Sequence, residues 1–211
     1  MKEILHYLNT TYWKLTDDAM GYILQHCDEQ TFKAGAVLQH SGKVCEYVWF
    51  VKMGLLRAYQ DHYDKDRGTM KTYNNWFMKE NDIATSVVSF FRMVPSEETI
   101  EAVEDAVVYR MSRSDLFTGA ARFHTMALLT LMIVIKYYCE TRIVETFLRM
   151  KDAEQMHQYL LSECDDLMGR LEERHKYSFL GISDTKYRGV KSGKSKEKDD
   201  VSKKNKKKKA G

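Results

Sequence analysis

The sequence predicts an α+β protein with an N-terminal β-roll, a long helix and a C-terminal domain of short helices. Three stretches carry this prediction. Residues 35–59 contain short β-branched and aromatic runs separated by glycines. Residues 120–150 repeat apolar side chains at helical spacing, and residues 177–185 hold a glycine between two helix-like segments.

The glycine-punctuated stretch predicts strands joined by tight turns. Gly35 and Gly42 bracket one short apolar run, and Gly54 splits a second into residues 48–51 and 55–59. β-Branched and aromatic side chains favour strands, and glycine permits the positive φ that tight turns require. A strand, a turn and a strand repeated at this spacing predict a β-roll. An unrelated small β-sandwich is the alternative.

The rest of the N-terminal half follows the same pattern of local signals. Residues 1–30 are predicted to be helical, with a helix start at residues 16–18, where aspartates follow a threonine. Further strands are expected at residues 70–77, 98–103 and 107–111. Residues 82–92 are expected to form a short helix or loop. Pro95, the only proline, marks a turn before the next strand.

Residues 120–150 are predicted to form one long helix that packs on two surfaces. Side chains spaced by four and three follow one seam, interrupted by Glu140: Met126, Thr130, Ile133, Tyr137, Val144 and Phe147. Other apolar residues, among them Leu128, Leu131 and Val134, lie off this seam. A helix that is apolar on more than one face needs a second partner besides its own domain.

The C-terminal part is predicted to be helical. Residues 153–164 and 167–176 are each expected to form a helix. In the run that follows, Gly181 is suited to end a helix and Ser183 to cap the next one. A helix, a short turn with glycine and a second helix form the signature of a helix-turn-helix.

The charge is concentrated at the C-terminus. The chain has a formal net charge of +3, but residues 192–211 contain nine lysines against three acidic residues. This tail therefore carries +6 and the remaining residues carry −3. Its composition, almost without apolar residues, predicts disorder. It is either a solvated end or a non-specific attractor of phosphates.

Composition excludes several classes of function. No apolar run approaches the roughly 20 residues of a membrane span, and the N-terminus lacks the apolar core of a signal peptide. A cytoplasmic protein without a membrane partner is therefore expected. The four cysteines are scattered without a Cys-x-x-Cys pair, so we expect idle thiols and neither a metal nor another cofactor. Phosphate-loop, nucleophile-elbow and His-x-x-x-His patterns are absent, so an enzyme is not expected.

A set of fixed positions carries a resemblance to a known family. They follow the pattern Gly-x-x-Leu-x-x-x-Gly and then Tyr-x-Phe-Ile-x-x-Gly-x-x-Arg, and are Gly35, Leu38, Gly42, Tyr47, Phe50, Gly54 and Arg57, with Val51 at the Ile position. This spacing resembles the entry to the cyclic-nucleotide-binding domain of the Crp–Fnr regulators. The resemblance implies four parts: a cyclic-nucleotide-binding-like β-roll (a double-stranded β-helix) at 1–118, a dimerisation helix at 119–150, a helix-turn-helix DNA-binding domain at 151–191 and the tail at 192–211.

The resemblance also locates an effector pocket, in which this chain departs from the family. Nucleotide-binding members hold the ribose with a glutamate and the cyclic phosphate with an Arg-Ser pair. Here Thr85 matches the glutamate, Ser96 the arginine and Glu97 the serine, while Arg92 precedes the loop. Carboxylates would repel a phosphate, so we expect cyclic AMP to bind poorly. The expected pocket residues are Thr85, Ser86, Ser96, Glu97 and Glu98. They would line a site for an unknown cationic or neutral small molecule, or a vestigial pocket filled by side chains.

The second site that the resemblance implies is a DNA-reading helix. Residues 177–183 fit the family pattern, except that Tyr177 replaces a small residue. The second half fits less well, because Arg188 stands at the usual serine and Gly189 at the usual arginine. The residues expected to contact DNA are Ser183, Thr185, Lys186, Arg188 and Lys191. A helical end-cap with ordinary surface charges is the alternative.

These expectations combine into one function. The chain is expected to be a homodimeric transcription regulator that binds double-stranded DNA and senses an effector through its β-roll. In the resembling family the long helix forms the dimer interface, which here would use the seam that begins at Met126 and ends at Phe147. The alternative is a ligand-sensing or protein-interaction module whose C-terminal end binds DNA only non-specifically.

Overall fold

A computed structural model describes residues 1–65, 68–150, 152–163 and 165–192. The chain divides into two compact units, which we call the N-terminal unit (Met1–Cys139) and the C-terminal unit (from Glu140 onward). Except for Ser192, the lysine-rich tail that was predicted to be disordered lies outside the described residues.

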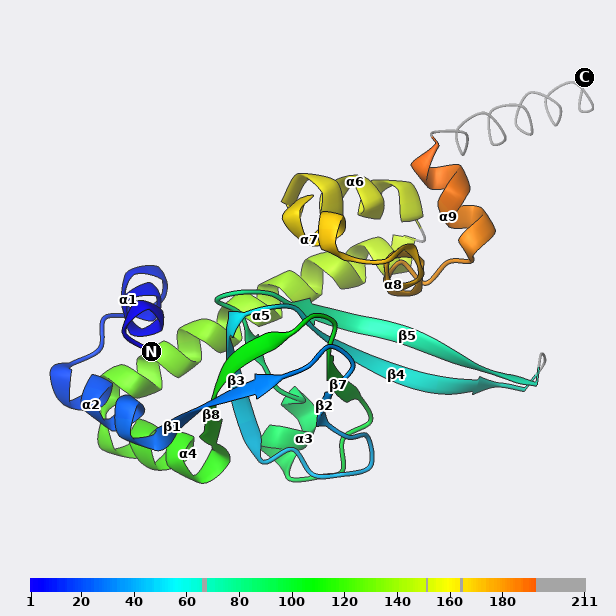
Figure 1. Cartoon of the computed structure of the whole chain (residues 1–211). Coiled ribbons are helices and arrows are strands. Elements are labelled where there is room, and N and C mark those ends of the chain that lie inside the picture. The colour runs from blue at the N-terminus through cyan, green and yellow to red at the C-terminus, as the bar shows by residue number, and fades with distance from the viewer. Residues whose placement is uncertain (66–67, 151, 164, 193–211) are drawn as a thin grey trace, which may run out of the picture. The chain divides into compact units, whose positions relative to one another are not determined.

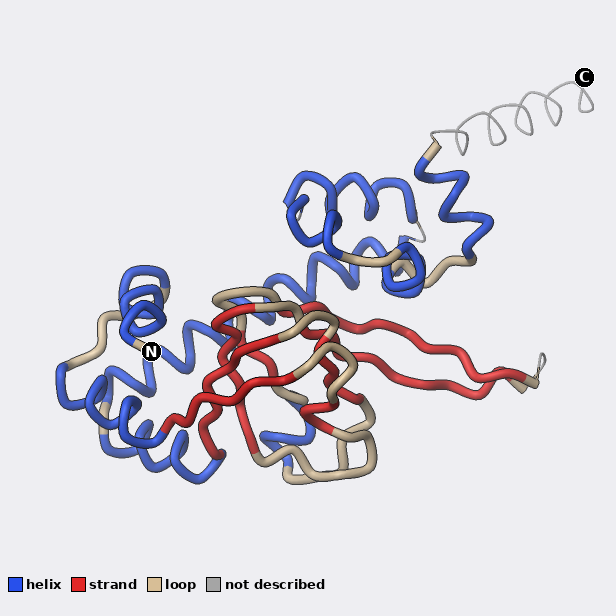
Figure 2. Tube along the Cα trace, in the orientation of Figure 1, coloured by secondary structure: helices blue, strands red, loops and turns tan. Residues whose placement is uncertain are grey.

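The N-terminal unit contains two antiparallel sheets and the helices around them (Figures 1 and 2). Its helices are α1 (Lys2–Thr11), α2 (Asp17–His26), α3 (Val87–Arg92) and α4 (Arg113–Arg122). Its strands are β1 (Cys27–Phe32), β2 (Val37–Gln39), β3 (Tyr47–Met53), β4 (Leu56–Asp64), β5 (Thr69–Met78), β6 (Ile83–Ala84), β7 (Thr99–Ala102) and β8 (Ala106–Ser112). Helix α5 (His124–Met150) begins in this unit and ends in the next.

The two four-stranded sheets enclose a core, which confirms the predicted β-roll. Their strand orders are β1-β8-β3-β6 and β2-β7-β4-β5. Trp49 and Val51 of the first sheet and Leu56 and Ile100 of the second belong to one buried cluster. Because side chains alternate along a strand, Arg57 points away from this core. The core therefore occupies the space between the sheets.

The N-terminal helices were predicted correctly at their start but not at their end. Thr16 caps α2 by accepting a hydrogen bond from the backbone N–H of Ala19, as the sequence predicted. The prediction that helix continues to residue 30 is wrong, because Cys27 begins β1. There the chain pairs with β8, starting opposite Met111. The polar residues of β1 carry no strand pattern of their own, so a partner distant in sequence decides their structure.

The long predicted helix is divided near its start. Helix α4 ends at Arg122, and Phe123 takes an extended backbone conformation before α5 begins. A Cβ on Gly119 would lie 2.5 Å from Met126 Sδ and 2.7 Å from Tyr22 Cε1. Glycine therefore lets α4 pack closely against Met126 of α5 and the ring of Tyr22 on α2, and a larger residue would make these side chains shift.

The C-terminal unit contains α6 (Ala153–Glu163), α7 (Asp165–Arg170), α8 (Glu173–Phe179) and α9 (Asp184–Lys191). The single helix predicted at 167–176 is thus two short helices, separated where Glu172 takes an extended conformation as the N-cap of α8. The core of this unit contains Met156, Leu160, Met168, Leu180 and Tyr187. Val144 and Phe147 from the end of α5 pack against it.

Among the residues that the structure describes, no helix has both the length and the apolar character needed to cross a membrane.

Candidate effector and nucleic-acid sites

The structure brings together the segments predicted to form the effector pocket. Ser86 ends the segment that follows β6, and Ser96 lies in the loop before β7. Both are about 3% exposed, and their hydroxyl oxygens are 2.9 Å apart. Ser96 Oγ also donates to the carbonyl oxygen of Glu98 at 2.7 Å and accepts its N–H at 3.1 Å. These hydroxyls are therefore satisfied within the chain.

The neighbouring polar groups are used in the same way. Thr85 donates its hydroxyl to the carbonyl oxygen of Tyr47 at 3.1 Å, and its oxygen lies 3.5 Å from Cys45 Sγ. Ser89 accepts the N–H of Cys45 at 2.8 Å and donates to the carbonyl oxygen of Val94 at 2.5 Å. Buried hydroxyls that close loops in this way leave few free donors for a ligand.

The two carboxylates predicted at the pocket are placed differently. Glu98 accepts a hydrogen bond from Asn75 Nδ2 at 3.2 Å, whereas Glu97 is exposed on the same loop. Arg92, the arginine nearest to this loop in the sequence, is also exposed. The segment thus offers two carboxylates and buried hydroxyls where a cyclic phosphate would need a guanidinium.

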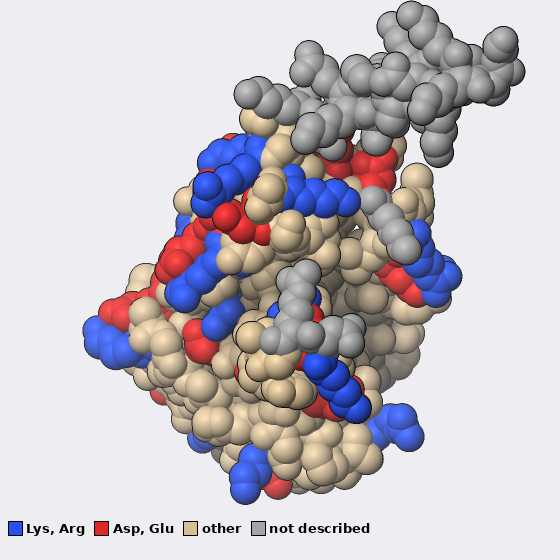
Figure 3. Space-filling view, turned by 90° about the vertical axis from the view of Figure 1, so that its right-hand side faces the viewer, with Lys and Arg blue, Asp and Glu red and all other residues tan. Residues whose placement is uncertain are grey.

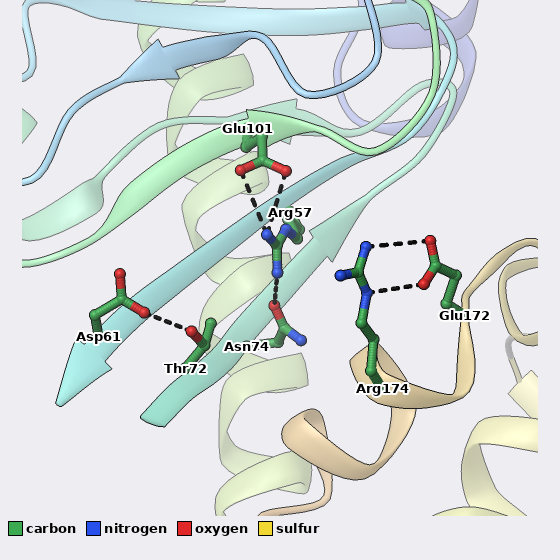
Figure 4. Close-up of polar contacts among 7 residues, drawn as sticks. All are labelled: Arg57, Asp61, Thr72, Asn74, Glu101, Glu172 and Arg174. Atoms are coloured by element: carbon green, nitrogen blue, oxygen red, sulfur yellow. Dashed lines mark hydrogen bonds and ion pairs between the residues drawn. The ribbon is translucent and has the colours of Figure 1, made fainter. Parts of the chain in front are cut away.

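Arg57, the last position of the family pattern, holds an ion pair on the outer face of the second sheet (Figure 4). Its Nη2 lies 3.2 and 3.3 Å from the two carboxylate oxygens of Glu101, and its Nη1 donates to Asn74 Oδ1 at 3.2 Å. The guanidinium also stacks 4.2 Å from the ring centroid of Tyr59. The arginine therefore ties β4 to β5 and β7. Sequence reasoning assigned it no role.

A clip joins α5 to the turn between β5 and β6. Tyr137 Oη accepts the backbone N–H of Ile83 at 2.7 Å and lies 3.4 Å from Asp82 Oδ1. Lys136 Nζ lies 3.1 Å from the same carboxylate oxygen. Burial, followed by the charge of Asp82, raises the pKa of Tyr137 well above its usual range. The phenol is therefore neutral and available as a hydrogen-bond donor.

Four of the six predicted interface residues pack against the chain's own cores. Met126 is 2% exposed, Ile133 packs against the same cluster, and Thr130 donates its hydroxyl to the carbonyl oxygen of Met126. Tyr137 belongs to the clip. Val144 and Phe147 pack in the C-terminal unit. Large apolar side chains lie exposed on other sides of the N-terminal half of α5: Leu131, Met132, Val134, Ile135 and Tyr138.

Helices α8 and α9 are joined by a turn that the sequence predicted. Gly181 has a φ of +64°. The N–H of Ile182 bonds to the carbonyl oxygen of Tyr177 and that of Gly181 to Ser178, which is a Schellman ending. Ser183 then caps α9 by accepting the N–H of Lys186.

Helix α9 separates its buried side from the residues predicted to contact DNA. Tyr187 and Val190 are buried, at 2% and 4% exposure. All five predicted residues are exposed: Ser183, Thr185, Lys186, Arg188 and Lys191. The ring of Tyr177 lies 6.4 Å from that of Tyr187, so bulky side chains fill the space between the two helices.

Acidic partners neutralise part of this surface. Arg188 pairs with Asp184 at 2.9 Å, and Lys191 pairs with Glu173 at 2.5 Å. The bond to Lys191 lowers the pKa of Glu173. A further pair, Arg174 with Glu172, has its nearest atoms 2.8 Å apart (Figure 4). Figure 3 shows basic and acidic side chains interspersed on the face that it draws. DNA would therefore have to compete with these pairs.

His157 is a buried side chain that the sequence did not single out. It is 6% exposed, and its Nδ1 has no hydrogen-bond partner among the described residues. Its ring centroid lies 5.6 Å from that of Tyr187, so it packs against the buried side of α9. Desolvation, followed by the charges of Lys176 and Lys191, lowers its pKa.

Comparisons with known proteins agree with the fold described above. Residues 29–122 match the family model of the cyclic nucleotide-binding domain. A mutant of CooA from Carboxydothermus hydrogenoformans is structurally similar, with a TM-score of 0.66, 17% identity and coverage of 86% of each chain. The chain has the Crp–Fnr fold.

Two further solved structures share this fold. A putative transcriptional regulator of the Crp/Fnr family from Eubacterium rectale gives a TM-score of 0.64 at 18% identity, covering 83% of this chain and 82% of that one. FixK2 from Bradyrhizobium japonicum gives 0.60 at 15% identity, covering 79% and 83%. No curated protein matches the sequence significantly. The structural matches thus confirm the fold that the sequence resemblance implied. For the β-roll, the match to the family model confirms it from the sequence as well.

Proposed function

We propose that this chain is a dimeric DNA-binding transcription regulator whose β-roll does not bind cyclic AMP. The proposal rests mainly on α9, a capped helix with one buried side and one exposed polar side, in a chain with the Crp–Fnr fold. Its capped N-terminus and its outward face expose polar and basic side chains, while Tyr187 and Val190 anchor its other side in a core. Recognition helices present N-terminal side chains to the major groove in this manner.

The hydrogen bonds at the expected effector pocket support the proposal that the β-roll does not bind cyclic AMP. Ser86 and Ser96 bond to each other, and Ser96 also bonds to the backbone of Glu98. A cyclic nucleotide would have to break these bonds and would gain no guanidinium in return. Binding of a regulatory molecule, rather than catalysis, is the role we assign to this unit.

Exposed apolar residues on α5 support the dimer. Leu131 is 52% exposed, Ile135 44% and Tyr138 65%, and their spacing of four and three residues places them on one stripe. We propose this stripe as the dimer interface, together with those residues of the predicted seam that remain half-buried. Such a stripe is costly to leave in water, and a second copy of the same helix is its simplest cover.

The test is selection of bound sites from a random DNA pool, followed by anisotropy titrations of the selected site over a range of salt concentrations. We expect a selected pseudo-palindrome to bind more tightly than mixed sequence, with and without residues 193–211. Arg188→Ala should cost about 1–3 kcal/mol of binding if this side chain reads a base. Lys14→Ala, a change at an exposed lysine of the other unit, is the control.

Two outcomes decide against the proposal. If the full chain binds every sequence equally and a chain ending at Ser192 binds none, the tail alone carries binding, and the protein is a sensing or interaction module with a non-specific end. If cyclic AMP at micromolar concentration tightens binding to the selected site, the β-roll holds the nucleotide despite its closed segment.

A further inference from the structure

Helix α3 buries a serine and exposes apolar side chains on its outer side. A surface helix normally turns its apolar residues toward the core and its polar residues toward water. In α3 the buried residues include Ser89, at 1% exposure, beside Phe90. The outward residues Val87, Val88 and Phe91 are 54%, 61% and 40% exposed.

The buried serine has a structural role that explains its position. Ser89 Oγ bonds to the N–H of Cys45 and to the carbonyl oxygen of Val94, so it fixes two loops. Phe90 belongs to the core cluster between the sheets, whereas Val87, Val88 and Phe91 do not. Their apolar character therefore requires another explanation.

The apolar surface continues from α3 onto α4. The ring centroid of Phe117, which is 43% exposed, lies 6.1 Å from that of Phe91 and 6.5 Å from that of Phe90. We call Val87, Val88, Phe91 and Phe117 together the α3 face. Its two aromatic rings, Phe91 and Phe117, pack on each other and on the buried ring of Phe90, so this part of the face is preformed.

Two arginines border the α3 face. Arg92 is the last residue of α3. Arg113 lies 4.6 Å from the ring centroid of Phe117 and donates its Nε–H to the carbonyl oxygen of Phe90 at 2.8 Å. No carboxylate pairs with either arginine among the residues that the structure describes. An apolar centre with unneutralised cations at its edge fits a partner with apolar and acidic groups.

The residue that ends α3 is a methionine in the left-handed conformation. Met93 has a φ of +54° and donates its N–H to the carbonyl oxygen of Ser89, and its side chain is 47% exposed. Residues other than glycine and asparagine rarely take this conformation. Glycine would relieve the backbone without loss of a buried side chain.

We propose that the α3 face binds an acidic amphipathic helix of another protein. The helix would place apolar residues on Val88, Phe91 and Phe117 and carboxylates beside Arg92 and Arg113. A second copy of the face is a poor occupant, since its arginines would repel those of the first. This proposal is independent of DNA binding, because the face lies wholly within the N-terminal unit.

Two synthetic helical peptides of about 15 residues provide the test. Both carry the same leucine stripe, flanked by glutamates in one and by lysines in the other. Fluorescence anisotropy with the full-length protein should show at least tenfold tighter binding of the glutamate peptide. Val88→Asp should abolish this binding. The double change Arg92→Glu and Arg113→Glu should reverse the preference toward the lysine peptide.

The melting temperature separates binding from folding. Val88→Asp changes a side chain that is 61% exposed, so it should leave the melting temperature unchanged while it abolishes binding of the glutamate peptide. Leu24→Asp, at an exposed leucine on α2, should leave peptide binding unchanged. Equal binding of both peptides, or no effect of Val88→Asp, would refute the proposal. Loss of self-association in Val88→Asp, or binding of the wild type to anionic vesicles but to neither peptide, would also overturn it in favour of a second copy or a membrane.

Discussion

Gly54 shows how closely a single position can be constrained. It follows β3 with a φ of +95°, and a Cβ there would lie 2.5 Å from the carbonyl oxygen of Asp105 and 2.8 Å from the Cα of Ala106. We expect Gly54→Ala to lower the free energy of unfolding by about 3 kcal/mol, since backbone strain and a backbone clash add. Gly42→Ala is the matched control: its φ is +79°, but the space around it is open, so it should cost about 1 kcal/mol. Urea unfolding followed by tryptophan fluorescence measures both, and equal costs would contradict the clash.

His157 makes the C-terminal unit sensitive to acid. Its pKa is lowered in the folded state, so between that value and about 6.5 the unfolded chain binds more protons. The stability that the neutral ring contributes is present above pH 6.5 and is lost as the pH falls through this window. We expect the wild type to lose more stability than His157→Gln between pH 7.5 and 5.

The three tryptophans allow this loss to be assigned to one unit. All of them lie in the N-terminal unit, at positions 13, 49 and 76. Acid unfolding of the C-terminal unit should therefore change helical circular dichroism before it changes tryptophan fluorescence. His124→Gln, at an exposed histidine, should behave as the wild type. A pH dependence of His157→Gln that equals that of the wild type would rule out this histidine as the cause.

At the residue scale, sequence reasoning succeeded where the causes are local. The turn at Gly181 and the cap at Ser183 depend on neighbours within a few residues, and both were predicted. The bond between Ser86 and Ser96 joins two loops, and the pair of Arg57 and Glu101 joins two strands. No pattern in the sequence marks such partners, so only the fold reveals them.

At the scale of elements, the clip between α5 and the β-roll has a measurable strength. Tyr137→Phe removes the acceptor of the Ile83 N–H and the group that faces Asp82. We expect a loss of about 1 kcal/mol in the stability of the N-terminal unit, because the half-buried N–H of Ile83 loses its partner. The ring of Trp76 lies 6.4 Å from that of Tyr137, so its fluorescence should report the change.

Tyr63→Phe is the control for the clip. This side chain on β4 is 52% exposed, and removal of its hydroxyl should leave stability within about 0.5 kcal/mol of the wild type. If the two variants are equally stable, the bond to Ile83 contributes nothing.

A helix or strand could be predicted where its own residues carry the pattern of that structure. The aromatic and β-branched runs of β3, β5 and β8 were recognised, whereas the polar run of β1 was taken for helix. The break between α4 and α5 was missed, because no proline marks Phe123 and the apolar spacing continues across it. Packing around Gly119 gives a physical reason for the close approach there.

For the whole molecule, the exposed stripe of α5 predicts the oligomeric state. Ile135→Asp should convert a dimer to a monomer in sedimentation, because a charge at the centre of an apolar interface stays unpaired. Leu24→Asp, which changes an equally exposed residue on α2, should leave the dimer intact.

Cys139 provides a second measurement of the same contact. Its side chain is exposed on α5, next to Tyr138 of the stripe. Mild oxidation should link two wild-type chains through this thiol, and Cys139→Ser should prevent the link. A monomeric wild type that forms no such disulfide would exclude the interface.

The overall organisation was largely predictable because the Crp–Fnr resemblance rests on glycines whose spacing fixes a β-roll. The sequence predicts parts that end at 118 and 150, with a dimerisation helix between them. The two compact units divide at Cys139, within the continuous helix α5. A uniform helical pattern gives no local sign of where one core stops and the next begins.

Because α5 continues from one unit into the next, the number of residues in it sets the direction in which its later side chains point. Each residue of α5 turns the helix by about 100° and advances it by about 1.5 Å, so one deleted residue near 140 would turn the side chains that follow it by more than a quarter-turn around the helix axis. Seven added residues would nearly restore their direction. Insertions near residue 140 should therefore be tolerated best in multiples of seven residues, whatever their chemical character.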